Sequence, residues 1–140
     1  VVRTTAPADF ADDLLAAIQR DLFTIGGRLA TPEPARLKEP QREKVAVAEA
    51  RIEALERAID EADRELPPLR AFVLPGGTPK AAALHLARAV SRRAERAVVH
   101  LSHVEEVPTE VLVYLNRLSD LLFTLARLAN HRAGTPDVTW

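Results

Sequence analysis

"TPKAAALHLARAVSRRAERAVVHL", residues 78–101, predicts one long helix and sets the fold class of the chain. Thr78 can cap the first turn of this helix, and Pro79 suits its first position. The helix is expected to end at Leu101. In the whole chain, hydrophobic residues make up 47% and aromatic residues only 4%. This balance favours packed helices over a β-sandwich.

Three further helices are predicted, which makes an all-α, antiparallel helical bundle. The four helices are expected over residues 9–29, 41–66, 79–101 and 109–130. In the other three helices apolar residues recur at a helical period: Phe10, Leu14, Ile18, Leu22 and Ile25; Val45, Ile52, Leu55 and Ile59; Val111, Leu115, Leu118, Leu122 and Leu125. Pro67 and Pro68 end the second helix. Gly26 and Gly27 either end the first helix or allow another backbone to come close.

Length and composition exclude several classes of function. At 140 residues the chain is expected to form one domain, residues 1–140. Its 19 lysines and arginines are balanced by 20 acidic residues, which argues against general nucleic-acid binding. Without cysteine there is no disulfide, thiolate metal site or cysteine nucleophile. No apolar run approaches the roughly 20 residues of a membrane span, and no leader is recognisable, so a cytoplasmic protein is expected.

The predicted third helix concentrates positive charge on one stripe. Arg88, Arg92 and Arg96 follow one another at four-residue intervals, with Glu95 beside the stripe and Arg93 pointing away from it. The planar guanidinium group of arginine suits bidentate binding of phosphate. The stripe therefore indicates either a polyphosphate site or a surface row paired with the acidic second helix.

The predicted fourth helix carries a short polar strip. Asn116 and Asp120 are four residues apart on one face, and Ser119 lies one position off it. Asp120 could orient an arginine, and Asn116 could read a base edge or a hydroxyl. A hydrogen bond that fixes helix packing is the alternative.

The loop "FVLPGGT", residues 72–78, leads directly into the helix of the arginine stripe. Gly76 and Gly77 permit positive φ, and a helix start is a natural anion site. A plain helix–helix turn explains the glycines equally well. Phe72 is expected either in the core or as a wall for a flat ligand.

The histidines give weaker signals. His100 and His103 stand near a helix end beside Glu105 and Glu106, where a surface cluster is favoured over a zinc site. His85 is expected to be a packed histidine rather than a catalyst. No Walker-A loop is present.

Together, "FVLPGGTPKAAALHLARAVSRRAERAVV", "YLNRLSDLLFTLARLAN" and "IQRDLFTIGGRLATP" closely resemble the PduO-type ATP:cob(I)alamin adenosyltransferases. The resemblance implies a helical bundle of five helices in the full domain, with a ferritin-like arrangement and homotrimeric assembly. It implies active sites between subunits and transfer of the 5′-deoxyadenosyl group of ATP to cob(I)alamin, with Mg²⁺ accompanying ATP. A cobalamin reductase and an adenosylcobalamin-dependent enzyme are the implied partners.

The resemblance also assigns roles to single residues. Arg88, Arg92 and Asn116 match ATP-binding positions, Arg92 neutralising the triphosphate, and Arg88 is similar to an arginine of an inter-subunit ion pair. Phe72 matches the aromatic residue against the lower corrin face, and Arg92 and Phe72 are the expected catalytic residues. Arg93, Glu95 and Asp120 are expected to be structural or interfacial, with Glu95 and Asp120 keeping the arginines ordered.

One departure from the family is clear. Its members begin with a phosphate-wrapping segment like "TRTGDDGTT" and a later "EVDELN" motif, and neither occurs in residues 1–140. Either this ATP-binding segment was cut or left out, or the chain is a degenerate member of the family; an omitted, mobile segment is favoured because the remaining motifs are intact. The rival hypotheses are a non-catalytic helical scaffold that binds an anion or a partner helix, and an unrelated phosphate-binding enzyme.

Overall fold

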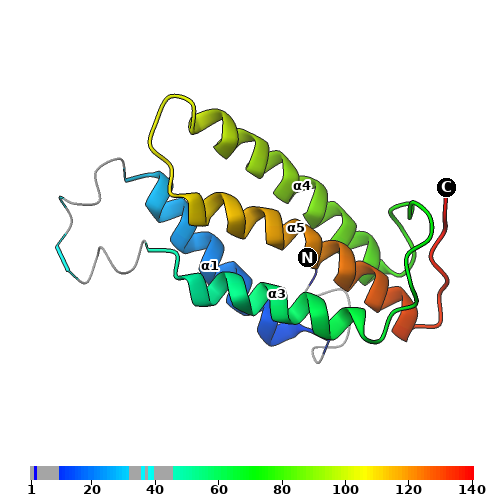
Figure 1. Ribbon diagram of the computed structural model, residues 1–140. Helices are drawn as coiled ribbons and strands as arrows, with labels where there is room; N and C mark the ends of the chain where they lie inside the picture. The colour runs from blue at the N-terminus through cyan, green and yellow to red at the C-terminus, as the bar shows by residue number, and fades with distance from the viewer. Residues whose placement is uncertain (1, 3–9, 32–35, 37, 40–45) are drawn as a thin grey trace.

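The computed structural model describes residues 2, 10–31, 36, 38–39 and 46–140. Apart from one antiparallel bridge, the regular structure within these residues is α-helical. The helices, labelled in Figure 1, are α1 (Asp12–Leu29), α3 (Glu49–Asp63), α4 (Pro79–Leu101) and α5 (Thr109–Arg132). The prediction of an all-α helical bundle is confirmed. None of the described helices combines the length and apolar character that crossing a membrane requires.

α5 forms the centre of the bundle. It runs between α4 on one side and α1 and α3 on the other (Figure 1). Fourteen of its 24 residues are buried, and from Leu121 to Asn130 only Phe123 is not fully buried. A helix that is buried on nearly every side must lie inside the fold rather than on its surface. The five apolar residues that were predicted to face inward from this helix all lie in the core.

A polar cluster joins the three helices on one side of the bundle. Asp21 of α1 accepts bonds from Arg51 of α3, from Nε at 3.0 Å and Nη2 at 2.9 Å, and from the Tyr114 hydroxyl of α5 at 2.7 Å. Tyr114 is fully buried. Burial raises the pKa of Tyr114, and the bond to Asp21 raises it further, because both favour the protonated hydroxyl. The cluster therefore sets the register of α1 and α3 against α5.

The bounds of α4 are those predicted from the sequence. Thr78 caps the helix, since its hydroxyl accepts a bond from the amide of Ala81 at 3.2 Å, and proline occupies the first turn. α5 runs two residues beyond its predicted end. Gly26 and Gly27 lie inside α1 and do not end it. A Cβ on Gly26 would meet nothing within 4 Å, so no backbone approaches there.

The other two helices are shorter than predicted. α1 begins at Asp12, and the predicted start at residue 9 lies outside the described residues, as do residues 41–45 with Val45. α3 begins only at Glu49 and ends at Asp63. Beyond Asp63 the amides of residues 65 and 66 bond three residues back, which tightens the chain into turns before the two prolines. Leu22, predicted to face inward, is 39% exposed.

Candidate functional site

The arginine stripe belongs to α4, which is separated from the acidic helix α3 by α5 (Figure 1). Arg88 is half-buried and its guanidinium lies 5.1 Å from the ring centre of Phe123 on α5. Arg92, Arg93 and Arg96 are exposed. Within the described part of the chain, no carboxylate forms an ion pair with any of these arginines. The described part of the acidic helix, α3, therefore does not pair with the stripe, and it lies across α5 from α4 (Figure 1).

The geometry of the stripe suits an anion from outside the chain. Arg88 and Arg92 are one turn apart, so both can reach the same polyanion. The ring of Phe123 supports the half-buried Arg88 by a cation–π contact, which satisfies the guanidinium without neutralising it. Because no carboxylate of the described chain balances them, these charges remain available for phosphate groups.

Asn116 bridges α4 and α5. Its Nδ2 donates to Glu95 Oε1 at 3.3 Å, and its Oδ1 accepts from Arg117 at 2.8 Å. Arg117 in turn donates to Glu56 of α3 at 2.9 Å. This chain of bonds confirms that Asn116 makes an inter-helix hydrogen bond. It also places the exposed amide of Asn116 next to the arginine stripe, since Glu95 lies beside that stripe.

The roles expected of the two acidic residues need correction. Glu95 accepts from Asn116 and from no arginine, and the exposed Asp120 has no arginine partner within the described residues. The prediction that these carboxylates keep the stripe ordered is therefore wrong for a single chain. Asp120 points to a different place: it lines a hollow of about 620 Å³ shared with Phe123, Arg127 and residues 66–69.

His85 is packed as predicted. Its side chain is only 6% exposed, and its ring meets Phe123 edge-on with centroids 6.2 Å apart. Burial lowers the pKa of His85, and the nearby Arg88 lowers it further. Its Nε2 and the buried hydroxyls of Ser91 and Ser119 have no hydrogen-bond partner among the described residues. His85, Phe123 and Arg88 thus form a stack that connects the core to the first arginine of the stripe.

The glycine loop before α4 is more than a plain turn. Gly77 has φ +101°, and a Cβ at this position would collide with the side-chain amide of Asn130. That amide accepts a bond from the Thr78 backbone at 2.9 Å and donates to the Gly76 carbonyl at 3.1 Å. Asn130 is 2% exposed. A buried side chain of α5 therefore fixes the loop through which the chain enters α4.

The hydrogen bonds of Asn130 thus clamp the loop before α4. A second clamp, which holds the C-terminal tail against α5, was not predicted from the sequence. Asn130 and Arg127 both donate to Asp137 in the C-terminal tail, at 3.2 and 3.4 Å, and Arg127 also donates to the Pro67 carbonyl at 2.9 Å. The available signal was the pair of polar residues three positions apart inside the most apolar part of α5. Because such groups need partners when buried, they indicate a segment packed against them.

Phe72 is presented to solvent by this clamped loop. Its side chain is 78% exposed, which excludes the core alternative. Its carbonyl accepts a bond from the amide of Trp140 at 2.9 Å, and the two rings meet edge-on with centroids 6.4 Å apart. An exposed aromatic ring on a fixed backbone can form one wall of a site for a flat apolar ligand.

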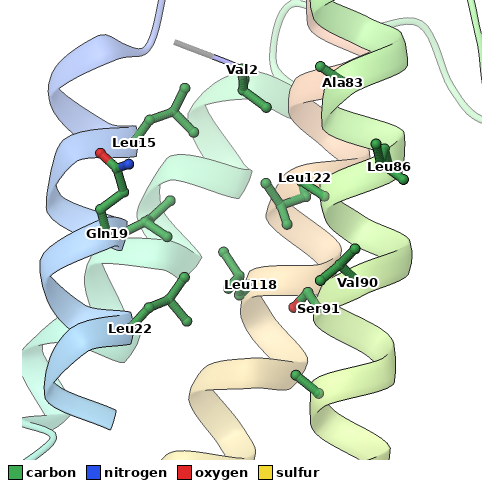
Figure 2. Close-up of a pocket in the computed structure, with 13 residues that line it drawn as sticks. Val2, Leu15, Gln19, Leu22, Ala83, Leu86, Val90, Ser91, Leu118 and Leu122 are labelled. Carbon is green, nitrogen blue, oxygen red and sulfur yellow. The ribbon is translucent and has the colours of Figure 1, made fainter. Parts of the chain in front are cut away.

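An apolar groove lies on the opposite face of α4. Figure 2 shows it between α1 and α4, with Leu118 and Leu122 of α5 at its floor. Its volume is about 440 Å³, and the described residues that line it carry no charge. Leu86 and Val90, 64% and 48% exposed, each lie about 200° around the helix from the arginine two residues later. The groove therefore cannot hold the anion for which the stripe is suited.

The described residues contain no group of three side chains that could hold a metal ion. His100 and His103 are exposed, with ring centroids 6.3 Å apart.

The chain is similar to known proteins. The sequence model of a family described as cobalamin adenosyltransferase matches residues 1–129. The corrinoid adenosyltransferase of Mycobacterium leprae is 44% identical over 133 residues, covering 91% of this chain and 66% of the relative. The chain thus spans about two thirds of the length of that relative.

Two solved structures of the PduO-type ATP:corrinoid adenosyltransferase from Lactobacillus reuteri are also similar. An arginine-to-lysine variant complexed with ATP is 38% identical, with a TM-score of 0.82 over 93% of this chain and 70% of that chain. A phenylalanine-to-alanine variant complexed with cobalamin and ATP is 35% identical, with a TM-score of 0.87 over 99% of this chain and 75% of that chain.

Proposed function

The chain belongs to the cobalamin adenosyltransferase family, and from that premise we propose that it transfers the 5′-deoxyadenosyl group of ATP to cob(I)alamin. The observation that carries the proposal is the arginine stripe of α4, which no carboxylate of the described chain neutralises. The similar Lactobacillus reuteri structure holds both ATP and cobalamin. The products are adenosylcobalamin and triphosphate.

The reaction makes limited demands on the protein. The electron pair of cob(I)alamin attacks C5′ of ATP, a cobalt–carbon bond forms, and the C5′–O5′ bond breaks as triphosphate leaves. The metal substrate is itself the nucleophile, so no side chain has to be activated. The protein must instead align the two substrates and stabilise the negative charge that develops on the leaving group.

Arg92 and Arg88 provide that charge stabilisation in the proposal. Arg92 is exposed and has no ion-pair partner among the described residues, so it is free to neutralise triphosphate oxygens as they leave. Arg88 is held against Phe123 and contributes a second, better-ordered guanidinium one turn away. Asn116, bonded to Glu95, offers its amide to the nucleotide from the neighbouring helix. Mg²⁺ would be held chiefly by the phosphate oxygens of ATP.

Phe72 serves the cobalamin substrate in the proposal. Its ring stands out from the clamped loop and is apolar and unable to coordinate cobalt. Placed against the lower corrin face, it excludes water and the lower axial ligand. Loss of that ligand favours reduction of cob(II)alamin to the nucleophilic cob(I) state, which a reductase would provide. Phe72 and Arg92 are thus the proposed catalytic residues.

The proposed assembly is a homotrimer with active sites between subunits. Two features of α4 support it: the exposed apolar pair Leu86 and Val90, and an arginine stripe that pairs with no carboxylate in the described part of its own chain. A neighbouring subunit can cover the first and pair with part of the second, including Arg88 and Arg93. The proposed setting is the cytoplasm, with an adenosylcobalamin-dependent enzyme as the consumer of the product.

The test is an assay of the full-length protein with ATP and chemically reduced cobalamin. Adenosylcobalamin is recognised by its light-sensitive absorption spectrum, and triphosphate is measured in the same sample. Equal amounts of the two products are expected, since one C5′–O5′ bond breaks for each cobalt–carbon bond formed. Binding of both substrates without either product would overturn the proposal.

A further inference from the structure

Phe72 is held in place by the C-terminal tail and not by the core. Its ring is 78% exposed, so few apolar neighbours surround it. Its ring contact among the described aromatic residues is with Trp140, 86% exposed, at a centroid distance of 6.4 Å and an interplanar angle of 64°. This is the edge-to-face geometry that aromatic pairs prefer.

The backbone brings the two rings to the same face. Residues 72–74 pair with residues 138–140 in antiparallel fashion around the bridge between Val73 and Thr139. Trp140 donates to the Phe72 carbonyl at 2.9 Å, and Leu74 donates to the Val138 carbonyl at 2.8 Å. Because successive side chains alternate between faces, Phe72 and Trp140 are cross-strand neighbours opposite to Val73 and Thr139.

The path of the tail does not depend on Trp140. Asp137, three residues earlier, is tied to α5 by the buried side chains of Arg127 and Asn130. Leu74 and Val138 hold the next pairing bond through their backbones. Removing the indole should therefore leave the fold and the tail in place, and should change only what lies beside the ring of Phe72.

We propose that Trp140 is a positioning residue, which holds the ring of Phe72 in the orientation that faces the lower side of the corrin. An exposed phenylalanine has several staggered χ1 rotamers open to it. The indole blocks some of them on the side of the tail. A ring with one orientation excludes the lower ligand and water from cobalt, whereas a ring that rotates away does not. This inference rests on the proposed function of Phe72.

The first experiment tests the contact without any substrate. The full-length protein is labelled with fluorophenylalanine, and the ¹⁹F signal of Phe72 is assigned by its loss in Phe72→Ala. In Trp140→Ala this signal should move, because the ring current of the indole is gone. In the matched variant Val138→Ala, which removes an exposed apolar side chain from the same face, it should stay. An unmoved signal in Trp140→Ala would overturn the proposal.

The second experiment tests the role. With ATP present, Trp140→Ala should convert less bound cob(II)alamin to the four-coordinate form, and kcat should fall about two- to tenfold while KM for ATP is unchanged. Trp140→Phe should restore most of the loss because a phenyl edge can take the same place. Melting temperatures should match those of the wild type.

Each other result has a distinct meaning. Full conversion by Trp140→Ala, an equal loss in Val138→Ala, or no rescue by Trp140→Phe would overturn the positioning role. A wild-type protein that binds cobalamin and ATP but forms no adenosylcobalamin would instead overturn the proposed function. In that case the ¹⁹F experiment still decides whether Trp140 orders Phe72.

Discussion

The side-chain amide of Asn130 occupies the space into which a Cβ on Gly77 would point. The same amide bonds the backbone on both sides of Gly77, at Gly76 and Thr78. The entry into α4, and with it the position of the arginine stripe, is therefore set by one buried residue of α5. The relationship explains why this turn requires glycine, since φ at Gly77 is also +101°.

Gly77→Ala should destabilise the protein strongly. A left-handed backbone costs a residue with a side chain about 1–3 kcal/mol, and displacing the amide of Asn130 adds the cost of overpacking, again about 1–3 kcal/mol. The measurement is the free energy of unfolding in denaturant. Gly26→Ala is the matched control: it lies in α1 with open space around it and should be neutral or stabilising by up to about 1 kcal/mol. Similar stability of the two variants would contradict the steric account.

Tyr114→Phe should lower stability by about 1.5–3 kcal/mol near neutral pH, because it removes a hydrogen bond to a charged carboxylate. The pKa of folded Tyr114 is raised above its ordinary value of 10.0 by burial and by Asp21. The stabilisation is therefore fully present below about pH 10 and is lost as the pH rises above it. The difference in unfolding free energy between the two proteins should stay constant from pH 7 to about pH 10 and should narrow from there to pH 11. A constant difference across this range would show that the raised pKa is not linked to folding.

Phe72→Ala should slow adenosylation without unfolding the protein. Truncation of a buried phenylalanine costs roughly 3–5 kcal/mol, but truncation at an exposed site is expected to stay within about 0.5 kcal/mol. ATP binding should be unchanged, and less cob(II)alamin should reach the four-coordinate form. Phe23→Ala is the control, since Phe23 is 87% exposed on α1 and lies outside the proposed site. An early-melting Phe72→Ala protein that still forms the four-coordinate spectrum would remove Phe72 from the mechanism.

Arg92→Ala should reduce turnover about 30- to 1,000-fold, since a charge-assisted contact to a leaving group supplies roughly 2–4 kcal/mol. An exposed arginine that only pairs on a surface contributes about 0–1 kcal/mol to stability, so unfolding should change little. Arg57→Ala removes an exposed charge from α3 and should leave turnover unchanged. If both variants turn over at the wild-type rate, the stripe has no role in triphosphate release.

The full-length protein should sediment as a trimer at micromolar concentration. The reason is that α4 exposes apolar side chains together with arginines that pair with no carboxylate among the residues that the structure describes. Sedimentation velocity over a range of protein concentrations measures the oligomeric state. A single monomeric species throughout would contradict the proposed inter-subunit sites.

The sequence by itself determined the helical class, the bounds of α4 and the existence of the arginine stripe. These depend on local properties: a cap at Thr78, a proline in the first turn, and a four-residue spacing that any helix turns into one face. The periodic spacing of apolar residues in α5 could also be recognised in the sequence, and the residues predicted to face inward are buried. The motifs around Phe72 and Asn116 were sufficient to identify the family.

Only the tertiary structure decided what these residues face. The sequence left Phe72 open between core and surface, and Asn116 between ligand and helix contact. It also placed Asp120 and Glu95 with the arginines of the stripe, which they do not meet within the described part of a single chain. Such partners come from segments distant in sequence: Asn130 bonds Thr78 and Gly76, which precede it by 52 and 54 positions, and Trp140 reaches Phe72 across 68 positions. Periodicity reports the side of a helix that is buried, but the packing of other elements decides which groups meet there.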